Sequence, residues 1–191
     1  MDPVTTMERV ITESRRLVDG ITPDQLSNPT LCTEWTVRDV LNHVTGGATY
    51  FGMVAERGSV PDELVGQLLG GEKDLLGDDY KASFNAAADK AMAGFSQPGV
   101  LEKIVKLPFG EMPAGIALNI AIFDVSTHNC DIAQATGQPI QDTEVLETAI
   151  EVGKKTVQPE MRVPGFFDAE QPCGGAAPPD QRLLAFAGRK V

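Results

Sequence analysis

The chain of 191 residues is long enough for one domain with a sizeable core, and its 42% hydrophobic and 23% charged residues are typical of a soluble globular protein. A net charge of −11 without any basic run argues against nucleic-acid binding, and no uncharged apolar stretch of about 20 residues is present to span a membrane. Three widely spaced cysteines (Cys32, Cys130 and Cys173) and the lack of a signal-peptide pattern lead us to expect a cytoplasmic protein with reduced, inert thiols.

The N-terminal part of the chain contains two helical patterns. Apolar residues at helical spacing predict a first helix over residues 5–21. The second helix has the clearest start signal in the chain, because Thr36 and Asp39 have the spacing of a capping box. Trp35 and Val40 occupy the flanking positions of a hydrophobic staple, so the first turn of this helix is well defined.

Loops and helices alternate in the middle of the chain. The glycine-rich stretch 58–77 predicts a long loop that contains a short helical turn at 63–69. A third helix with an apolar inner face is expected over 79–95. The pattern of residues 101–107 does not decide between a short strand and an extended linker.

The next segment, residues 113–136, is apolar nearly all round in its first half, which predicts a central and buried helix. Pro113 suits its first position, and Gly137 ends it. Asp142 caps a fifth helix. A segment rich in proline and glycine follows and is closed by a short helix over 180–187.

These patterns predict an all-α or mainly α-helical protein. The simplest arrangement is a four-helix bundle over residues 1–160, with a small irregular and helical C-terminal extension over 161–191 that packs on the bundle.

Both histidines of the chain fall inside apolar helical patterns. Asp124 and His128 are four residues apart and therefore lie one turn apart on one face of the central helix, while His43 lies in the second helix. A buried carboxylate is costly unless it is paired or bound to a cation, and facing helices of a bundle commonly form metal sites. We therefore interpret His43, Asp124 and His128 as three ligands of a divalent metal. Asp131 is either a rival ligand or a hydrogen-bond acceptor that fixes the His128 tautomer.

Two imidazoles and one carboxylate suit zinc with an open fourth position, although Fe(II), Mn and Ni are compatible with the same donors. The structural alternative is that these residues are satisfied polar groups of a core or cleft. Gly46 and Gly47 follow His43 and cost helix stability. They indicate either tight helix packing or open volume for a ligand beside His43.

Three stretches carry a resemblance to a known family. Residues 29–43 (PTLCTEWTVRDVLNH) are similar to the motif PT-C-x-x-W-x-V-x-D-L-x-x-H, and residues 124–137 (DVSTHNCDIAQATG) are similar to H-x-W-D-L-A-x-A-T-G. A weaker match covers residues 180–189 (DQRLLAFAGR). The chain thereby resembles the DinB-like metal-binding superfamily, in the branch of mycothiol-dependent maleylpyruvate isomerase and its N-terminal domain.

This resemblance implies a DinB-like four-helix bundle that holds a divalent metal, usually zinc or nickel, with His43, Asp124 and His128 at the ligand positions. In the isomerase the middle ligand is a glutamate, so Asp124 is a shorter substitute that requires slightly closer helices. Cys130 stands where the family often has tryptophan. We recognise no counterpart of the larger C-terminal domain of the isomerase, so isomerase activity does not follow from the resemblance.

Three functions stay open at this stage. The first is metal-dependent transfer of a low-molecular-weight thiol such as mycothiol to a small electrophile, or thiol-dependent isomerisation, with Tyr50, Arg182 and Arg189 as contacts for the thiol or substrate. The second is metal-dependent hydrolysis, with water in place of the thiol. The third is a non-enzymatic metal-binding or interaction module that forms a homodimer. No further catalytic residue stands out.

Overall fold

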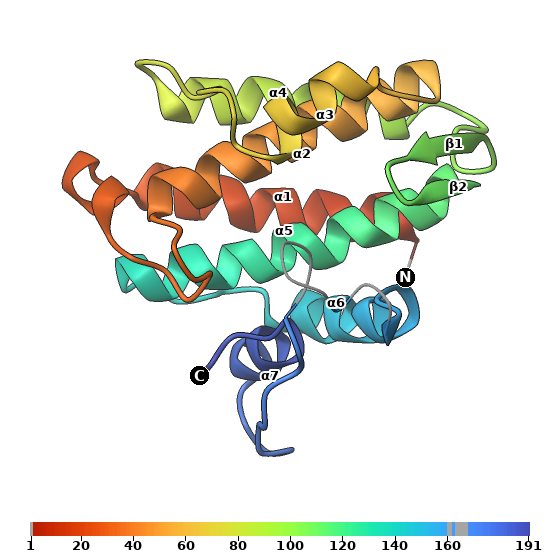
Figure 1. Ribbon diagram of the computed structural model, residues 1–191. Helices are drawn as coiled ribbons and strands as arrows, with labels where there is room; N and C mark the ends of the chain where they lie inside the picture. Colours follow the sequence, from red (N-terminus) through yellow and green to blue (C-terminus); the bar gives the residue numbers. More distant parts are fainter. Residues whose placement is uncertain (1, 160–161, 163–167) are drawn as a thin grey trace.

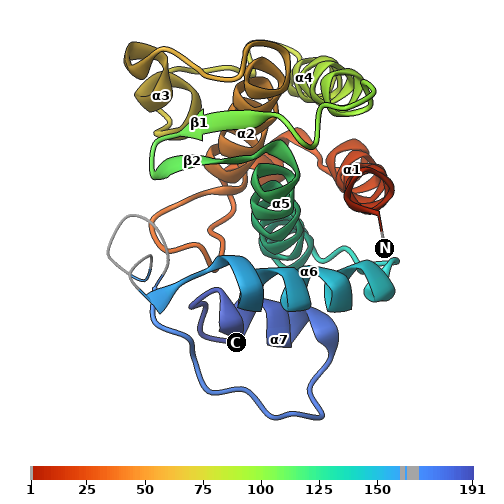
Figure 2. The same cartoon turned by 90° about the vertical axis from the view of Figure 1, so that its right-hand side faces the viewer.

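Four helices enclose a single core in the computed structural model, which describes residues 2–159, 162 and 168–191. They are α1 (Pro3–Gly20), α2 (Val37–Arg57), α4 (Tyr80–Phe95) and α5 (Ala114–Thr136). Helices α2 and α1 each pack against both α4 and α5, which closes the bundle (Figures 1 and 2). The prediction of a mainly helical four-helix bundle is therefore confirmed.

The remaining elements lie around this bundle. They are η1 (Pro23–Ser27), α3 (Asp62–Leu69), β1 (Ile104–Leu107), β2 (Gly110–Pro113), α6 (Thr143–Thr156) and α7 (Pro179–Phe186). Helix α3 packs on α2, and α6 and α7 cover another side of α5 (Figure 2). In the part of the chain that the structure describes, no helix combines the length and the apolar character needed to cross a membrane.

The start of α2 follows the predicted capping box. The Asp39 backbone N–H donates to Oγ1 of Thr36 at 3.3 Å, and the Thr36 backbone N–H donates to the Asp39 carboxylate at 2.8 Å. These reciprocal bonds satisfy donors that the first turn of a helix leaves free. Gly58 ends α2 in the left-handed conformation with φ 82°, which glycine adopts without steric cost.

Several helix boundaries differ from the prediction by one or two residues, and two of these differences have a clear local cause. Helix α1 begins at Pro3, two residues earlier, because Asp2 accepts the Thr5 N–H and proline suits the first helical position. Pro113 is not the first residue of α5 but its N-cap, since its backbone still pairs with Ile104 in the hairpin.

The undecided stretch 101–107 contains a strand. Strands β1 and β2 pair antiparallel, with Leu107 opposite Gly110 at the turn end. The helical turn expected at 63–69 is present as α3. The domain boundary expected at 160/161 lies outside the described residues.

Helix α5 is central because most of its surface is covered. Ala117, Leu118 and Ile122 are fully buried, and each large apolar side chain removed from water contributes about 1.5–3 kcal/mol. On the side of α6 and α7, Phe123 meets Phe186 edge to face, with ring centroids 5.6 Å apart. One stripe of α5 stays accessible and includes Ile116, Ile120 and Asp124. This stripe leads to the candidate site.

Candidate metal centre

The three residues predicted as metal ligands converge between α2 and α5. Nε2 of His43 lies 3.4 Å from Oδ2 of Asp124, and Nε2 of His128 lies 3.7 Å from Oδ1 of the same carboxylate. One donor atom from each residue lies within 4.8 Å of the others. Donors of a tetrahedral zinc ion stand about 3.4 Å apart, given metal–ligand bonds of about 2.1 Å. The donor set therefore fits one divalent ion, and the shorter aspartate reaches both imidazoles.

The other nitrogen of each imidazole has its own partner. Nδ1 of His43 donates to the backbone carbonyl of Leu69 at 3.1 Å, and Nδ1 of His128 donates to Oδ2 of Asp131 at 3.0 Å. A carbonyl or carboxylate oxygen only accepts, so the ring proton sits on Nδ1 and the Nε2 lone pair faces Asp124. Of the two roles considered for Asp131, this geometry favours the acceptor that fixes the His128 tautomer.

The two glycines that follow His43 have different surroundings. A Cβ atom at Gly46 would overlap the backbone carbonyl oxygen of Leu68, so α3 approaches α2 this closely only because residue 46 has no side chain. A Cβ atom at Gly47 would meet nothing within 4 Å. Tight packing thus applies at Gly46 and open space at Gly47. The close packing also brings the carbonyl of Leu69, the next residue, to His43.

The contact between Asp124 and the neighbouring imidazoles alters the pKa values of Asp124 and His43. Burial by itself would raise the pKa of Asp124, but His43 and His128 beside it lower this pKa to about 2. Burial would likewise lower the pKa of His43, yet the Asp124 carboxylate leaves it raised above its usual value. The side chains of Asp124 and His43 are 27% and 17% exposed, against 6% for His128. The site is therefore accessible on the side of Asp124 and His43.

Two further side chains form the wall behind the site. The Trp35 ring packs against both imidazoles, with centroids 5.0 Å from His43 and 5.8 Å from His128. Cys32 has its sulfur within 4.8 Å of ligand atoms of His128 and Asp131. Burial, the largest effect on this thiol, raises the pKa of Cys32 to about 11, which keeps it neutral. The sequence did not indicate these contacts, although both residues belong to the stretch 29–43 that carries the family resemblance.

The three expected thiol or substrate contacts lie in different places. Arg189 donates to Asp131, behind His128, and its side chain is 11% exposed. Arg182 on α7 pairs with Glu147 of α6. Tyr50 is buried in α2, and no hydrogen bond or ring contact among the described residues joins it to His43, Asp124 or His128.

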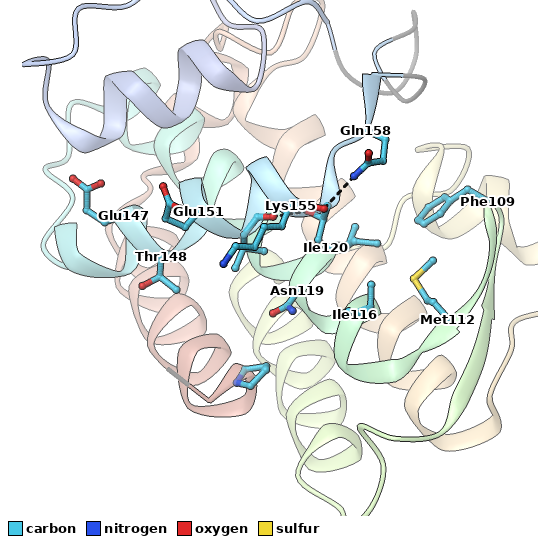
Figure 3. A pocket seen from close by; sticks show the side chains of 13 residues that line it. Phe109, Met112, Ile116, Asn119, Ile120, Glu147, Thr148, Glu151, Lys155 and Gln158 are labelled. Atoms are coloured by element: carbon cyan, nitrogen blue, oxygen red, sulfur yellow. Dashed lines mark hydrogen bonds between the residues drawn. The ribbon is translucent and has the colours of Figure 1, made fainter.

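A groove lies along the accessible face of the first half of α5. The groove has a volume of about 810 Å³. Most of its lining side chains come from the hairpin, α5 and α6 (Figure 3). Its apolar lining includes Phe109, Met112, Ile116 and Ile120, and none of the three candidate ligands. Ile120 precedes Asp124 by one helical turn, so the groove begins next to the site. A second cavity beside Asp124 measures about 20 Å³, room for one water molecule.

The fold and the site define a helical bundle of the DinB-like class with an imidazole–carboxylate cluster between two of its helices. The family model described as "Mycothiol maleylpyruvate isomerase N-terminal domain" matches residues 7–133. The chain belongs to this family.

Similar proteins cover the whole chain or most of it. The uncharacterized proteins MT0763 and Rv0738, from two strains of Mycobacterium tuberculosis, are each 35% identical over 197 residues, which is all of this chain and all of theirs. Crystal structures of the mycothiol-dependent maleylpyruvate isomerase and of a histidine-to-alanine mutant align with TM-scores of 0.61 at 16% and 15% identity. The alignments cover 81% of this chain and 65% of the isomerase chain, and at this identity they show a shared fold.

Proposed function

We propose that the chain is a divalent-metal-dependent enzyme that activates a low-molecular-weight thiol such as mycothiol for transfer to, or isomerisation of, a small electrophile. The observation that carries this proposal is the convergence of His43, Asp124 and His128, with the protons of both imidazoles held on Nδ1. The family description, which names mycothiol, supports the choice of thiol over water.

The chain's own residues would hold the metal by Nε2 of His43, a carboxylate oxygen of Asp124 and Nε2 of His128, and zinc suits this donor set best. A divalent metal at this place lowers the pKa of a thiol bound to it, so that the thiolate is available as a nucleophile at neutral pH. The thiol would reach the ligands from the accessible side, where Asp124 and His43 are most exposed. Trp35 packs against both imidazoles and would limit the approach of water from its side.

The electrophile would approach along the accessible stripe of α5. Ile120 lies one turn before Asp124 and provides an apolar surface that continues into the groove. An electrophile with an apolar part is therefore the substrate class that the surroundings favour.

Protein purified without a histidine tag tests this proposal. We expect about one zinc or nickel ion per chain by elemental analysis, and mycothiol-dependent consumption of maleylpyruvate or of a model electrophile that stops after complete metal removal. Activity that persists unchanged without metal would overturn the proposal. Cys173→Ser, which removes the exposed thiol, is the control for nonspecific thiol reactivity and should retain activity.

The same assay separates the alternative functions. A saturable requirement for the thiol is expected of the proposed enzyme, whereas turnover without any thiol would indicate a hydrolase. His43→Ala should abolish both metal binding and activity. A His43→Ala variant that retains its full cellular function would instead indicate a non-enzymatic module.

A further inference from the structure

The C-terminal segment reaches the metal centre through one arginine. After α7 the chain reverses at Gly188, which has φ 93° and leaves no room for a side chain beside Asp168. The Arg189 backbone N–H donates to the carbonyl of Leu184, and this bond fixes the reversed chain. Arg189 thereby points from the end of the chain into the bundle, next to α5.

The guanidinium of Arg189 meets a fully buried carboxylate. It donates to Asp131 through Nη2 at 3.0 Å and Nε at 3.4 Å, a two-point contact that fixes the plane of the carboxylate. The Asp131 side chain is 0% exposed and has two hydrogen-bonding partners among the described residues, Arg189 and His128. Both partners bind Oδ2.

Arg189, Asp131 and His128 therefore form one chain of hydrogen bonds that ends at Nδ1 of His128, and Nε2 of the same ring faces Asp124. We propose that Arg189 is a positioning residue of the metal centre, which acts through Asp131 to hold the His128 ring and its Nδ1 proton. This inference rests on the proposed metal site. It makes the C-terminal segment part of the site, although that segment contributes no ligand.

Without Arg189, the orientation of Asp131 would depend on His128 alone, and the imidazole would lose the fixed acceptor that sets its angle and tautomer. Partners behind a metal-binding histidine typically contribute about 10–100-fold to metal affinity. Lysine keeps the positive charge but not the two-point geometry, so Arg189→Lys should restore part of this affinity.

The test measures zinc affinity of the full-length protein by competition with a chromogenic chelator. We expect Arg189→Met to bind zinc about 10–100-fold more weakly than wild type, and Arg189→Lys to fall between the two. Arg9→Met is the matched control, because it removes an arginine that also forms a two-point contact with an aspartate, Asp142, which is not one of the three candidate ligands. Its zinc affinity should equal that of wild type.

The outcomes separate this inference from the proposed function. Wild-type protein that binds no zinc would overturn the metal site itself. Wild-type and Arg189→Met affinities that are equal, while His43→Ala has lost binding, would overturn only the role of Arg189.

A spectroscopic measurement covers the case in which Arg189→Met folds poorly. The chain has two histidines, so long-range ¹H–¹⁵N spectra of the metal-free protein report each ring, and His43→Ala assigns them. We expect His128 as the Nδ1–H tautomer in wild type, with that signature reduced in the Arg189 variants and His43 unchanged. A wild-type His128 protonated on Nε2 alone, or a signature unaltered in Arg189→Lys and Arg189→Met, would overturn the inference.

Discussion

Gly46 of α2 lies against the backbone carbonyl of Leu68, so closely that a Cβ atom at residue 46 would overlap its oxygen. Gly46→Ala should therefore push α3 outward and break the bond between Nδ1 of His43 and Leu69. Gly47→Ala, one residue later, enters open space and should stabilise α2 by about 0.5–1 kcal/mol.

Urea unfolding and zinc competition measure both glycine variants. We expect Gly46→Ala to lower both the free energy of unfolding and the zinc affinity. Gly47→Ala should raise the free energy of unfolding. Equal effects of the two substitutions on stability would contradict this account of the α2–α3 contact.

Glu34 has a φ of 71°, the only non-glycine residue with a positive φ in the described part of the chain. It lies in a turn closed by a bond from the Trp35 N–H to the Cys32 carbonyl, so it places two residues of the site wall. This conformation costs an L-residue about 1–2 kcal/mol, which glycine avoids. Since glycine also raises the entropy of the unfolded chain, Glu34→Gly should stabilise the protein by about 0.5 kcal/mol.

Thr33→Gly is the matched control in the same turn. Thr33 does not have a positive φ, so glycine relieves no strain there and should destabilise the protein by about 0.5–1 kcal/mol. Thermal unfolding at neutral pH compares the two. A Glu34→Gly variant that is as destabilised as Thr33→Gly would show that the left-handed conformation carries no strain.

Zinc should stabilise the folded protein through Asp124. A ligand at about 100 times its Kd adds about 2.7 kcal/mol to the free energy of unfolding when it binds only the folded state. Asp124→Asn has the same size but loses the charged donor, so we expect most of this gain to disappear. Asp24→Asn, on η1, makes the same change of charge away from the site and should keep the gain. The measurement is the melting temperature of wild type and both variants with and without zinc.

Asp142 provides a pH-dependent contribution to stability. The hydrogen bond from Arg9, the largest effect, together with a backbone bond from Val145, lowers the pKa of Asp142 below its ordinary value of 3.8. A group with a lower pKa in the folded state stabilises the protein above the unfolded pKa, and this contribution disappears as the pH falls through both values. Asp142→Asn keeps the helix cap and loses the charge.

Wild type should therefore be more stable than Asp142→Asn at pH 7, and the difference should shrink as the pH approaches 3. Asp79→Asn is the control, because Asp79 caps α4 in the same way without an arginine partner among the described residues. Urea unfolding across this pH range is the measurement. A difference that stays constant with pH would contradict the role of the Arg9 pair.

The sequence predicted the elements whose signals are local. Helical periodicity and the Thr36–Asp39 capping box located the helices, and the spacing of Asp124 and His128 placed two site residues on one face. The missing parts depend on the folded chain. The Leu69 carbonyl has no side-chain signature, and Arg189 reaches Asp131 across 58 positions only after α6 and α7 have folded back on α5.

The hydrogen bond from His43 goes to a backbone carbonyl, so it does not depend on which side chain residue 69 carries. Substitution of the Leu69 side chain leaves the acceptor in place, whereas insertion or deletion in residues 58–79 moves it. The bond to His43 therefore constrains the length of this segment more than the identity of residue 69. The opposite holds at His128, where a single base change at Asp131 removes the acceptor. The hydrogen bond of His43 is therefore sensitive to insertions and deletions, whereas that of His128 is sensitive to a single substitution.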